Sequence, residues 1–221
     1  MIARTITSRL LTALLACALC AAAPGCAADG DVGSGEDVED SELPLISSIP
    51  NAELDAFYAD RANYRAVKKE VAEWFPFDEN ACTAFMTTAL RQAGMQIPNA
   101  MIWNGETGPD RQRVSIWINT SGLSQYLIRK AGWRKITDVN DLRPGDVVFT
   151  RPAERGASDF HTPLHPRHAY MFHGWKNKPR TGLVVDNQWE EYGDRGFGMY
   201  ERNIGFFDGE RSMFWFALRA R

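Results

Sequence analysis

After its first fifty residues, the chain shows hydrophobic positions that recur at helical spacing. Between residues 51 and 75 they fall on one face, which predicts a single long amphipathic helix. Asn51 can cap this helix, and Pro76 closes it. The apolar face consists of Leu54, Phe57, Tyr58, Val67, Val71 and Trp74. We expect the helix to pack on the domain through that face.

A second helix is predicted over residues 80–94. Apolar residues recur there at helical spacing, Asp78 and Asn80 are candidate N-caps, and Gly94 is placed to end the helix. Cys82 therefore lies in the first turn, where the helix dipole favours a negative charge. This position stabilises a thiolate, which is the reactive form of cysteine.

The pattern changes from helical to strand-like further along the chain. Residues 95–120 are mostly loop-like, with a short strand predicted at 114–118, and Ser121 caps a helix that Gly132 ends. A Pro-Gly turn at 141–146 then leads into a series of strands. The strands are predicted at residues 147–150, 168–173, 182–188 and 213–218. Helices followed by an antiparallel sheet predict an α+β fold.

The front of the chain has the composition of a targeting segment. A charge-free apolar run at residues 10–23 is too short for a stable membrane anchor and is typical of an export signal. Gly25-Cys26 resembles a bacterial lipoprotein junction, so we assign residues 1–26 as a signal peptide and Cys26 as the lipid-bearing residue. Simple cleavage near Ala23 or Ala28 is the alternative.

Residues 27–48 are expected to form a disordered acidic tether. Seven acids, three glycines and no Lys or Arg lie between residues 27 and 45, and such a segment cannot bury a core. The remaining chain, residues 49–221, has a slight excess of basic residues and no basic block of the kind that marks nucleic-acid binding. We therefore expect one domain that binds no nucleic acid and meets a membrane only through a lipid anchor.

Cys82 is the only cysteine of the predicted domain. The other cysteines, at positions 17, 20 and 26, all lie in the signal region. In an oxidising compartment Cys82 therefore has no partner for a disulfide, and a cysteine-based zinc cluster is excluded for the same reason. Cys82 is either an inert buried thiol or a reactive one.

Among the four histidines, His168 is the best candidate for a catalytic base. It begins a predicted strand, and a rigid scaffold can hold its ring. His161 and His165 lie in a polar loop and could join His168 as zinc ligands, but no carboxylate or cysteine is suitably spaced nearby. His173, five residues further on, faces away from His168. We predict neither a metal nor a cofactor.

A hairpin after His168 supplies the third polar group. If the connection is centred near Asn177, His168 lies directly opposite Asp186. Opposed Cβ atoms in such a pair are roughly 4.5–5.5 Å apart, so the carboxylate can accept a hydrogen bond from the imidazole. A slip of one residue would put Asn187 in that role.

A cysteine, a histidine and an acid without a phosphate-binding or cofactor-binding motif imply acyl transfer. Cys82 would be the nucleophile, and His168 would act first as base and then as acid. Asp186 would fix the tautomer of the ring and stabilise its charged form. The backbone N–H of Cys82 is the expected oxyanion donor.

Three stretches of the chain resemble the cell-wall cysteine hydrolases of the NlpC and CHAP type. The stretches are Cys82–Phe85, Leu142–Phe149 and His168–Gly174. Those families are relatives of papain in fold and place a cysteine at a helix start, an L-x-P-G-D turn before a strand, and a histidine on the next strand. Asp186 followed by Gln188 leans toward CHAP. The resemblance covers roughly residues 75–190 and implies a papain-like fold with N-terminal helices packed on an antiparallel sheet.

By this resemblance, the function is hydrolysis of amide bonds in peptidoglycan peptides. The enzyme would be an exported monomer, located in the periplasm and cell envelope as a lipoprotein or secreted, and either remodelling of its own wall or attack on other cells fits. The alternative is a non-catalytic envelope lipoprotein that keeps the fold and binds wall peptides. Ala81, where these families carry a polar residue before the cysteine, motivates that alternative.

Aromatic residues are candidates for the substrate cleft. Most of the tryptophans are expected to pack in the core. The tryptophans considered as candidates are Trp103, Trp117, Trp133, Trp175, Trp189 and Trp215. We expect Trp103, Trp189 and Gln188 to line the substrate-binding site.

Overall fold

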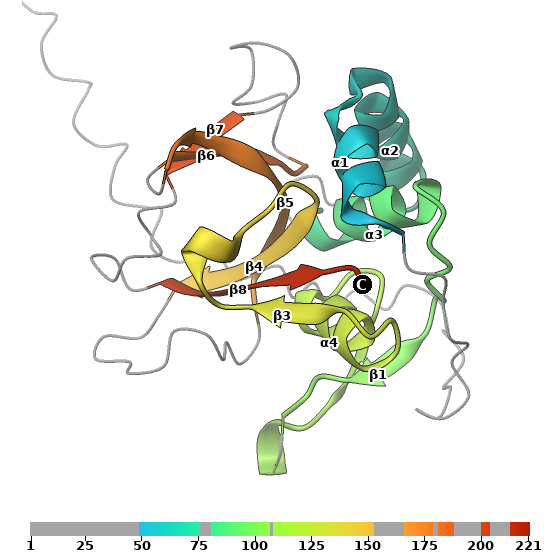
Figure 1. Ribbon diagram of the computed structural model, residues 1–221. Helices are drawn as coiled ribbons and strands as arrows, with labels where there is room; N and C mark the ends of the chain where they lie inside the picture. The colour runs from blue at the N-terminus through green and yellow to red at the C-terminus, as the bar shows by residue number, and fades with distance from the viewer. Residues whose placement is uncertain are drawn as a thin grey trace, which may run out of the picture.

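A computed structural model describes most of the chain from residue 49 onward and has an α+β fold. The described residues are 49–75, 81–106, 108–152, 166–178, 181–187, 200–203 and 213–221. Helices α1, α2 and α3 gather on one side of a curved antiparallel sheet, and α4 lies with β1 at another end of the molecule (Figure 1). Among these residues, no helix is both long and apolar enough to cross a membrane.

The predicted long N-terminal helix is in fact two helices, α1 (Asn51–Ala59) and α2 (Arg61–Trp74). Asp60 interrupts the helical backbone with φ −81° and ψ 120°, and its carboxylate accepts hydrogen bonds from the N–H groups of the next helix. A single N-cap of this kind contributes about 1 kcal/mol. The break turns the chain between two amphipathic helices, and both bury apolar residues.

Asn51 does not cap α1, contrary to the sequence prediction. Pro50 stands at the N-cap, and no described side chain caps that end. Instead, the Asn51 amide donates to Asp146 Oδ1 at 2.8 Å and its oxygen accepts from the Ala220 N–H at 3.1 Å. Asn51 thus joins the start of the described fold to its end.

Helix α3 (Cys82–Gln92) carries the cysteine in its first turn, as the spacing predicts. Ala81 is its N-cap and supplies no side-chain cap; the candidate caps Asp78 and Asn80 lie outside the described residues. Gly94 has φ 110°, and the Met95 N–H bonds the Leu90 carbonyl at 3.0 Å, which closes the helix in a Schellman motif. Every residue from Cys82 to Leu90 is buried, so α3 is the central helix of the core.

The middle segment forms a small hairpin and one further helix. Strands β1 (Met101–Trp103) and β2 (Arg113–Ser115) pair antiparallel, and the short 3-10 helix η2 (Gly108–Asp110) lies between them. Helix α4 spans Thr120–Arg129. Its cap is Asn119, which accepts from two backbone N–H groups, rather than the predicted Ser121.

In the part of the chain that the structure describes, the main sheet has six strands in the order β3-β8-β4-β5-β6-β7, and each neighbouring pair is antiparallel. The last strand, β8, lies inside the sheet between β3 and β4. A 3-10 helix, η3 (Val139–Asp141), connects β3 to the turn before β4. The strands are β3 (Arg134–Ile136), β4 (Asp146–Pro152), β5 (His168–Asn177), β6 (Thr181–Val185), β7 (Tyr200–Asn203) and β8 (Met213–Arg219).

The Pro-Gly turn before β4 is confirmed. The Asp146 N–H bonds the Arg143 carbonyl at 3.1 Å across the turn. Gly145 has φ 87°, and a Cβ at this position would lie 2.2 Å from the Asn51 carbonyl oxygen. The position therefore requires glycine both for its backbone angle and for space.

The predicted register of the β5–β6 hairpin is wrong. Strand β5 continues to Asn177 through two irregularities, and the ladder pairs Met171 with Val185 and Phe172 with Val184. Continuing this register puts Asp186 diagonally across from His168, two positions away from the directly opposite site. Because the shift is even, both side chains stay on the same face of the sheet.

Candidate active site

Cys82 lies where the start of α3 meets the start of β5. Only 1% of the residue is exposed. Its Sγ is 3.8 Å from the Arg167 carbonyl oxygen and 3.9 Å from Thr83 Oγ1. The Cys82 thiol also hydrogen bonds the His168 side chain. The sulfur is thus surrounded by polar groups although it is shielded from solvent.

His168 links the thiol to a buried carboxylate. Its Nε2 is 2.9 Å from Asp186 Oδ2, and Asp186 is fully buried. Because Nε2 faces Asp186, Nδ1 is the ring atom that can exchange a proton with Cys82. The structure therefore brings together the three residues that the sequence nominated, in the order thiol, imidazole, carboxylate.

The ionisation of His168 is displaced from its ordinary range. Burial disfavours the charged ring, but the hydrogen bonds with Asp186 and Cys82 and the negative charges of those two groups outweigh it. The net effect raises the pKa of His168 from 6.5 to about 9. At neutral pH the ring is therefore protonated, and an imidazolium lies beside the sulfur.

Strand β4 fixes the start of β5. Thr150 pairs with His168 in the ladder, and the Arg167 N–H bonds the Thr150 carbonyl at 2.8 Å. A histidine on the inner strand of a six-stranded sheet has little freedom, which suits a proton-transfer group. On the helix side, Thr83 Oγ1 lies 2.8 Å from Thr120 Oγ1, so the cysteine helix is tied to the first turn of α4.

The first turn of α3 offers backbone donors. The initial N–H groups of an α-helix have no carbonyl partner within the helix, and no side chain among the described residues caps α3. These groups and the positive end of the helix dipole stabilise a negative charge at the sulfur or on an oxygen bound next to it.

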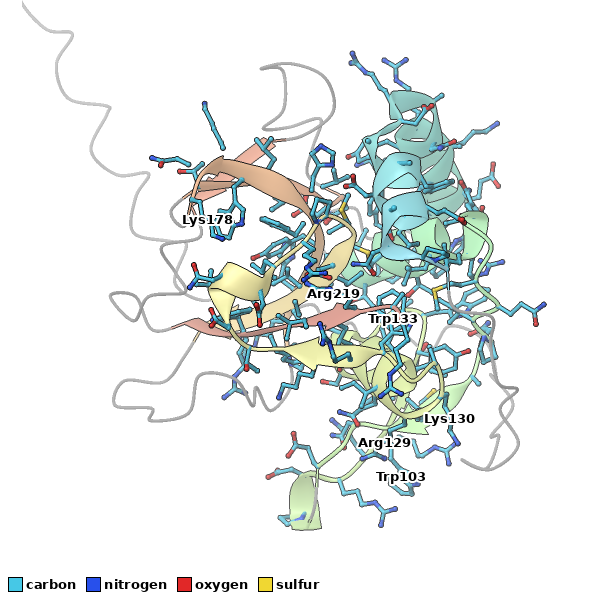
Figure 2. All side chains as sticks on the ribbon, viewed as in Figure 1. Trp103, Arg129, Lys130, Trp133, Lys178 and Arg219 are labelled. Atoms are coloured by element: carbon cyan, nitrogen blue, oxygen red, sulfur yellow. The ribbon has the colours of Figure 1, made fainter. Side chains whose placement is uncertain are left out.

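The structure does not bring Trp103 to this group. Trp103 belongs to the β1–β2 hairpin, and its ring lies beneath the Arg111 guanidinium at 3.9 Å and near that of Arg113 at 5.5 Å. Figure 2 shows Trp103 at the lower end of the molecule, well apart from Arg219 in the sheet. The other two candidate substrate-binding residues, Gln188 and Trp189, lie outside the described residues.

Of the remaining histidines, two lie outside the described residues and one pairs with a carboxylate of α1. His161 and His165 are outside the described residues, whereas His173 Nδ1 bonds Asp55 Oδ1 of α1 at 2.5 Å. Within the described part of the chain, no three His, Cys, Asp or Glu side chains gather as metal ligands. Trp133 and Trp215 are buried in the core, as expected.

Sequence reasoning missed two residues beside the site. The Tyr64 hydroxyl donates to the Asn187 carbonyl at 3.2 Å, and Lys68 Nζ donates to the same oxygen at 3.0 Å. Both come from α2, more than one hundred residues earlier in the chain. Their spacing of four residues was the only available signal, and it is common on helices.

Searches of protein-family models, curated proteins and solved structures find no match to this chain.

Proposed function

We propose that this chain is a cysteine hydrolase that cleaves amide bonds in peptidoglycan peptides. The observation that carries the proposal is the position of the His168 ring, which bonds the buried Asp186 carboxylate at 2.9 Å and also the Cys82 thiol. A nucleophile, a base and an orienting carboxylate in one group are the components of nucleophilic acyl transfer. The raised pKa of His168 adds support, because it favours the thiolate–imidazolium pair at neutral pH.

The reaction would proceed through a thioester. The Cys82 thiolate attacks the amide carbonyl carbon, and the N–H groups of the first turn of α3 stabilise the oxyanion. His168 then gives its proton to the leaving nitrogen as the C–N bond breaks. A water molecule, deprotonated by His168, attacks the thioester, which releases the carboxylic acid and restores the thiolate.

The substrate class comes from the resemblance to NlpC-type and CHAP-type hydrolases in the stretches that begin at Cys82, Leu142 and His168. Together with the α+β architecture, this resemblance supports a papain-like fold. An export signal over residues 1–26 and an acidic tether over 27–48 would deliver the domain to the cell envelope or beyond it, with Cys26 as the lipid-bearing residue.

A second candidate function is favoured by the burial of the sulfur. Cys82 is only 1% exposed and donates its thiol hydrogen to the Arg167 carbonyl, a contact that suits a neutral thiol. A domain with such a cysteine would bind wall peptides without cleaving them.

Digestion of purified sacculi tests the proposal directly. The wild-type protein should release peptide fragments that mass spectrometry identifies by their newly formed carboxyl and amino ends. The Cys82→Ala variant should release none. Equal release by Cys82→Ala, or no release by the wild type, would contradict hydrolysis through this cysteine.

Alkylation by iodoacetamide separates the two candidates. A hydrolase should react with a pH midpoint well below ~8.5, the value of a free thiol. Absent reactivity, or a midpoint near the free value, would favour the peptide-binding function.

A further inference from the structure

Asp186 follows directly after the last residue of β6, where the described pairing with β5 has ended. The final ladder pair is Met171 with Val185. A carboxylate that must meet an imidazole within hydrogen-bond distance needs a fixed backbone. The described contacts of the next residue, Asn187, indicate where that support comes from.

Helix α2 binds the backbone next to Asp186 through two side-chain hydrogen bonds. Tyr64 Oη and Lys68 Nζ both donate to the Asn187 carbonyl oxygen, at 3.2 and 3.0 Å. The two donors are one helical turn apart and so project from the same face of α2. Asn187 itself is 4% exposed, so these bonds are shielded from water and are stronger than surface bonds.

The same helix also contacts the cysteine helix. The buried Tyr64 ring packs on Phe85 of α3 with their centroids 5.1 Å apart. Phe85 lies one turn beyond Cys82. One helix thus fixes both the nucleophile and the residue after the carboxylate.

We propose that Tyr64 and Lys68 are positioning residues, which hold Asp186 against His168 through the backbone carbonyl of Asn187. The inference deepens the proposed function, and its catalytic consequence rests on that function. We call the two hydrogen bonds from Tyr64 and Lys68 to the Asn187 carbonyl the brace. Its effect on His168 can be measured without any turnover.

A pocket beside the brace explains why these bonds matter. It has a volume of about 250 Å³ and lies between α2, the start of α3 and Asn187. Its lining includes Lys68, Val71, Phe75, Ala81 and Phe85. The Asn187 backbone could shift into this space if its donors were lost, so packing alone does not fix its position.

The ionisation of His168 reports on the brace. Among the described residues, those that interact with the ring include Asp186, Cys82 and Tyr170, whose ring centroid is 5.8 Å away. When the carboxylate is less firmly held, the imidazolium loses part of its stabilisation and its pKa falls. NMR titration of the His168 ring measures this directly in the full chain.

Tyr64→Phe is the primary variant, because it removes one donor, keeps the aromatic ring and changes no charge. We expect it to lower the pKa of His168 by about one unit. Tyr64→Phe with an unchanged ring pKa would overturn the proposal, provided that circular dichroism shows the native fold.

Lys68→Met is the second variant, and Lys69→Met is its matched control. Lys69 is exposed on the same helix, so its loss changes the charge without touching Asn187. Loss of a positive charge raises the pKa of a nearby histidine, whereas loss of the brace lowers it. We therefore expect the pKa of His168 to be lower in Lys68→Met than in Lys69→Met. Lys68→Arg should restore the wild-type titration. Equal titrations of Lys68→Met and Lys69→Met would contradict the brace.

The outcome is distinguishable from failure of the proposed function. A shifted His168 titration together with no release of peptides would retain the brace and reject hydrolysis. Peptide release with unshifted titrations in Tyr64→Phe and Lys68→Met would retain hydrolysis and reject the brace.

Discussion

Among the described residues, two carboxylates are fully buried, Asp146 at the start of β4 and Asp186 directly after β6, and the groups around them differ in kind. Asp146 accepts from Arg219 Nε and Nη2 at 2.8 and 2.6 Å, from Asn51 at 2.8 Å and from the Arg143 N–H at 2.8 Å. Asp186 instead faces an imidazole, which in turn faces a thiol.

The identity of the cation separates the two regions. An arginine side chain is a permanent hydrogen-bond donor that carries no acceptor and is not deprotonated in proteins. Histidine can gain and lose a proton, so the His168–Asp186 pair has two accessible states. A buried carboxylate surrounded by permanent donors stabilises a structure, whereas one that is paired with a titratable ring next to a nucleophile can support chemistry.

The largest expected effect is the loss of hydrolysis when the nucleophile is replaced, with little change in stability. Cys82→Ser keeps the size and the hydrogen-bonding capacity of the side chain but removes the reactive sulfur. We expect hydrolysis to fall by about 10⁴-fold or more, while the free energy of unfolding changes by less than about 1 kcal/mol. Peptide release from sacculi and urea denaturation measure the two quantities. A large loss of stability would mean that Cys82 stabilises the fold and does not serve as a nucleophile.

Asp146→Asn should show the opposite pattern. The substitution leaves the buried Arg219 guanidinium without its counter-charge and should cost about 3–5 kcal/mol of unfolding free energy. The rate of Cys82 alkylation in the folded protein should stay at the wild-type value. Urea denaturation measures the loss of stability, and iodoacetamide kinetics measure the reactivity of Cys82. A loss of thiol reactivity in folded protein would show that Asp146 also affects the candidate active site.

Asp186→Asn should reduce hydrolysis less than loss of the nucleophile, by about 10²-fold, because the ring loses its orienting charge but keeps a polar neighbour. Asn187→Ala is the matched control, since it retains the backbone carbonyl that α2 binds. Comparing kcat/KM of the two variants checks the assignment. A comparable loss in Asn187→Ala and none in Asp186→Asn would transfer the orienting role to Asn187.

The smallest effect is the dependence of stability on pH. The pKa of His168 is raised in the folded state, so the protonated ring stabilises the fold fully below pH 6.5, the unfolded value, and this contribution is lost as the pH rises through about 9. The difference in unfolding free energy between the wild type and His168→Gln should therefore shrink over that range. An unchanging difference in urea denaturation from pH 6 to 9.5 would mean that the pair does not titrate there.

Local patterns predicted the parts of the fold that depend on neighbouring residues. The cysteine helix with its Gly94 stop, the Pro-Gly turn before β4 and the strand that begins at His168 all follow from spacing and turn chemistry. The grouping of His168 with Asp186 survived a wrong register because the error was even, which keeps both side chains on one face.

The missed features depend on contacts between distant parts of the chain. The break at Asp60 competes with a continuous apolar face, and the irregularities of β5 leave no clear mark in its sequence. The use of Asn51 beside Asp146 and Ala220, and of Lys68 beside Asn187, joins residues separated by 95 to 169 positions. Periodicity carries no information at that range.

The place of β8 in the sheet has a consequence for how the molecule is made. Because β8 pairs on one side with β3 and on the other with β4, it joins β3 to the four strands β4–β7, and these parts of the sheet are not connected until β8 is in place. A ribosome delivers β8 after every other described strand of the sheet, and Arg219 at its end completes the bonds to Asp146. Assembly of the native sheet must therefore wait until β8 has been translated.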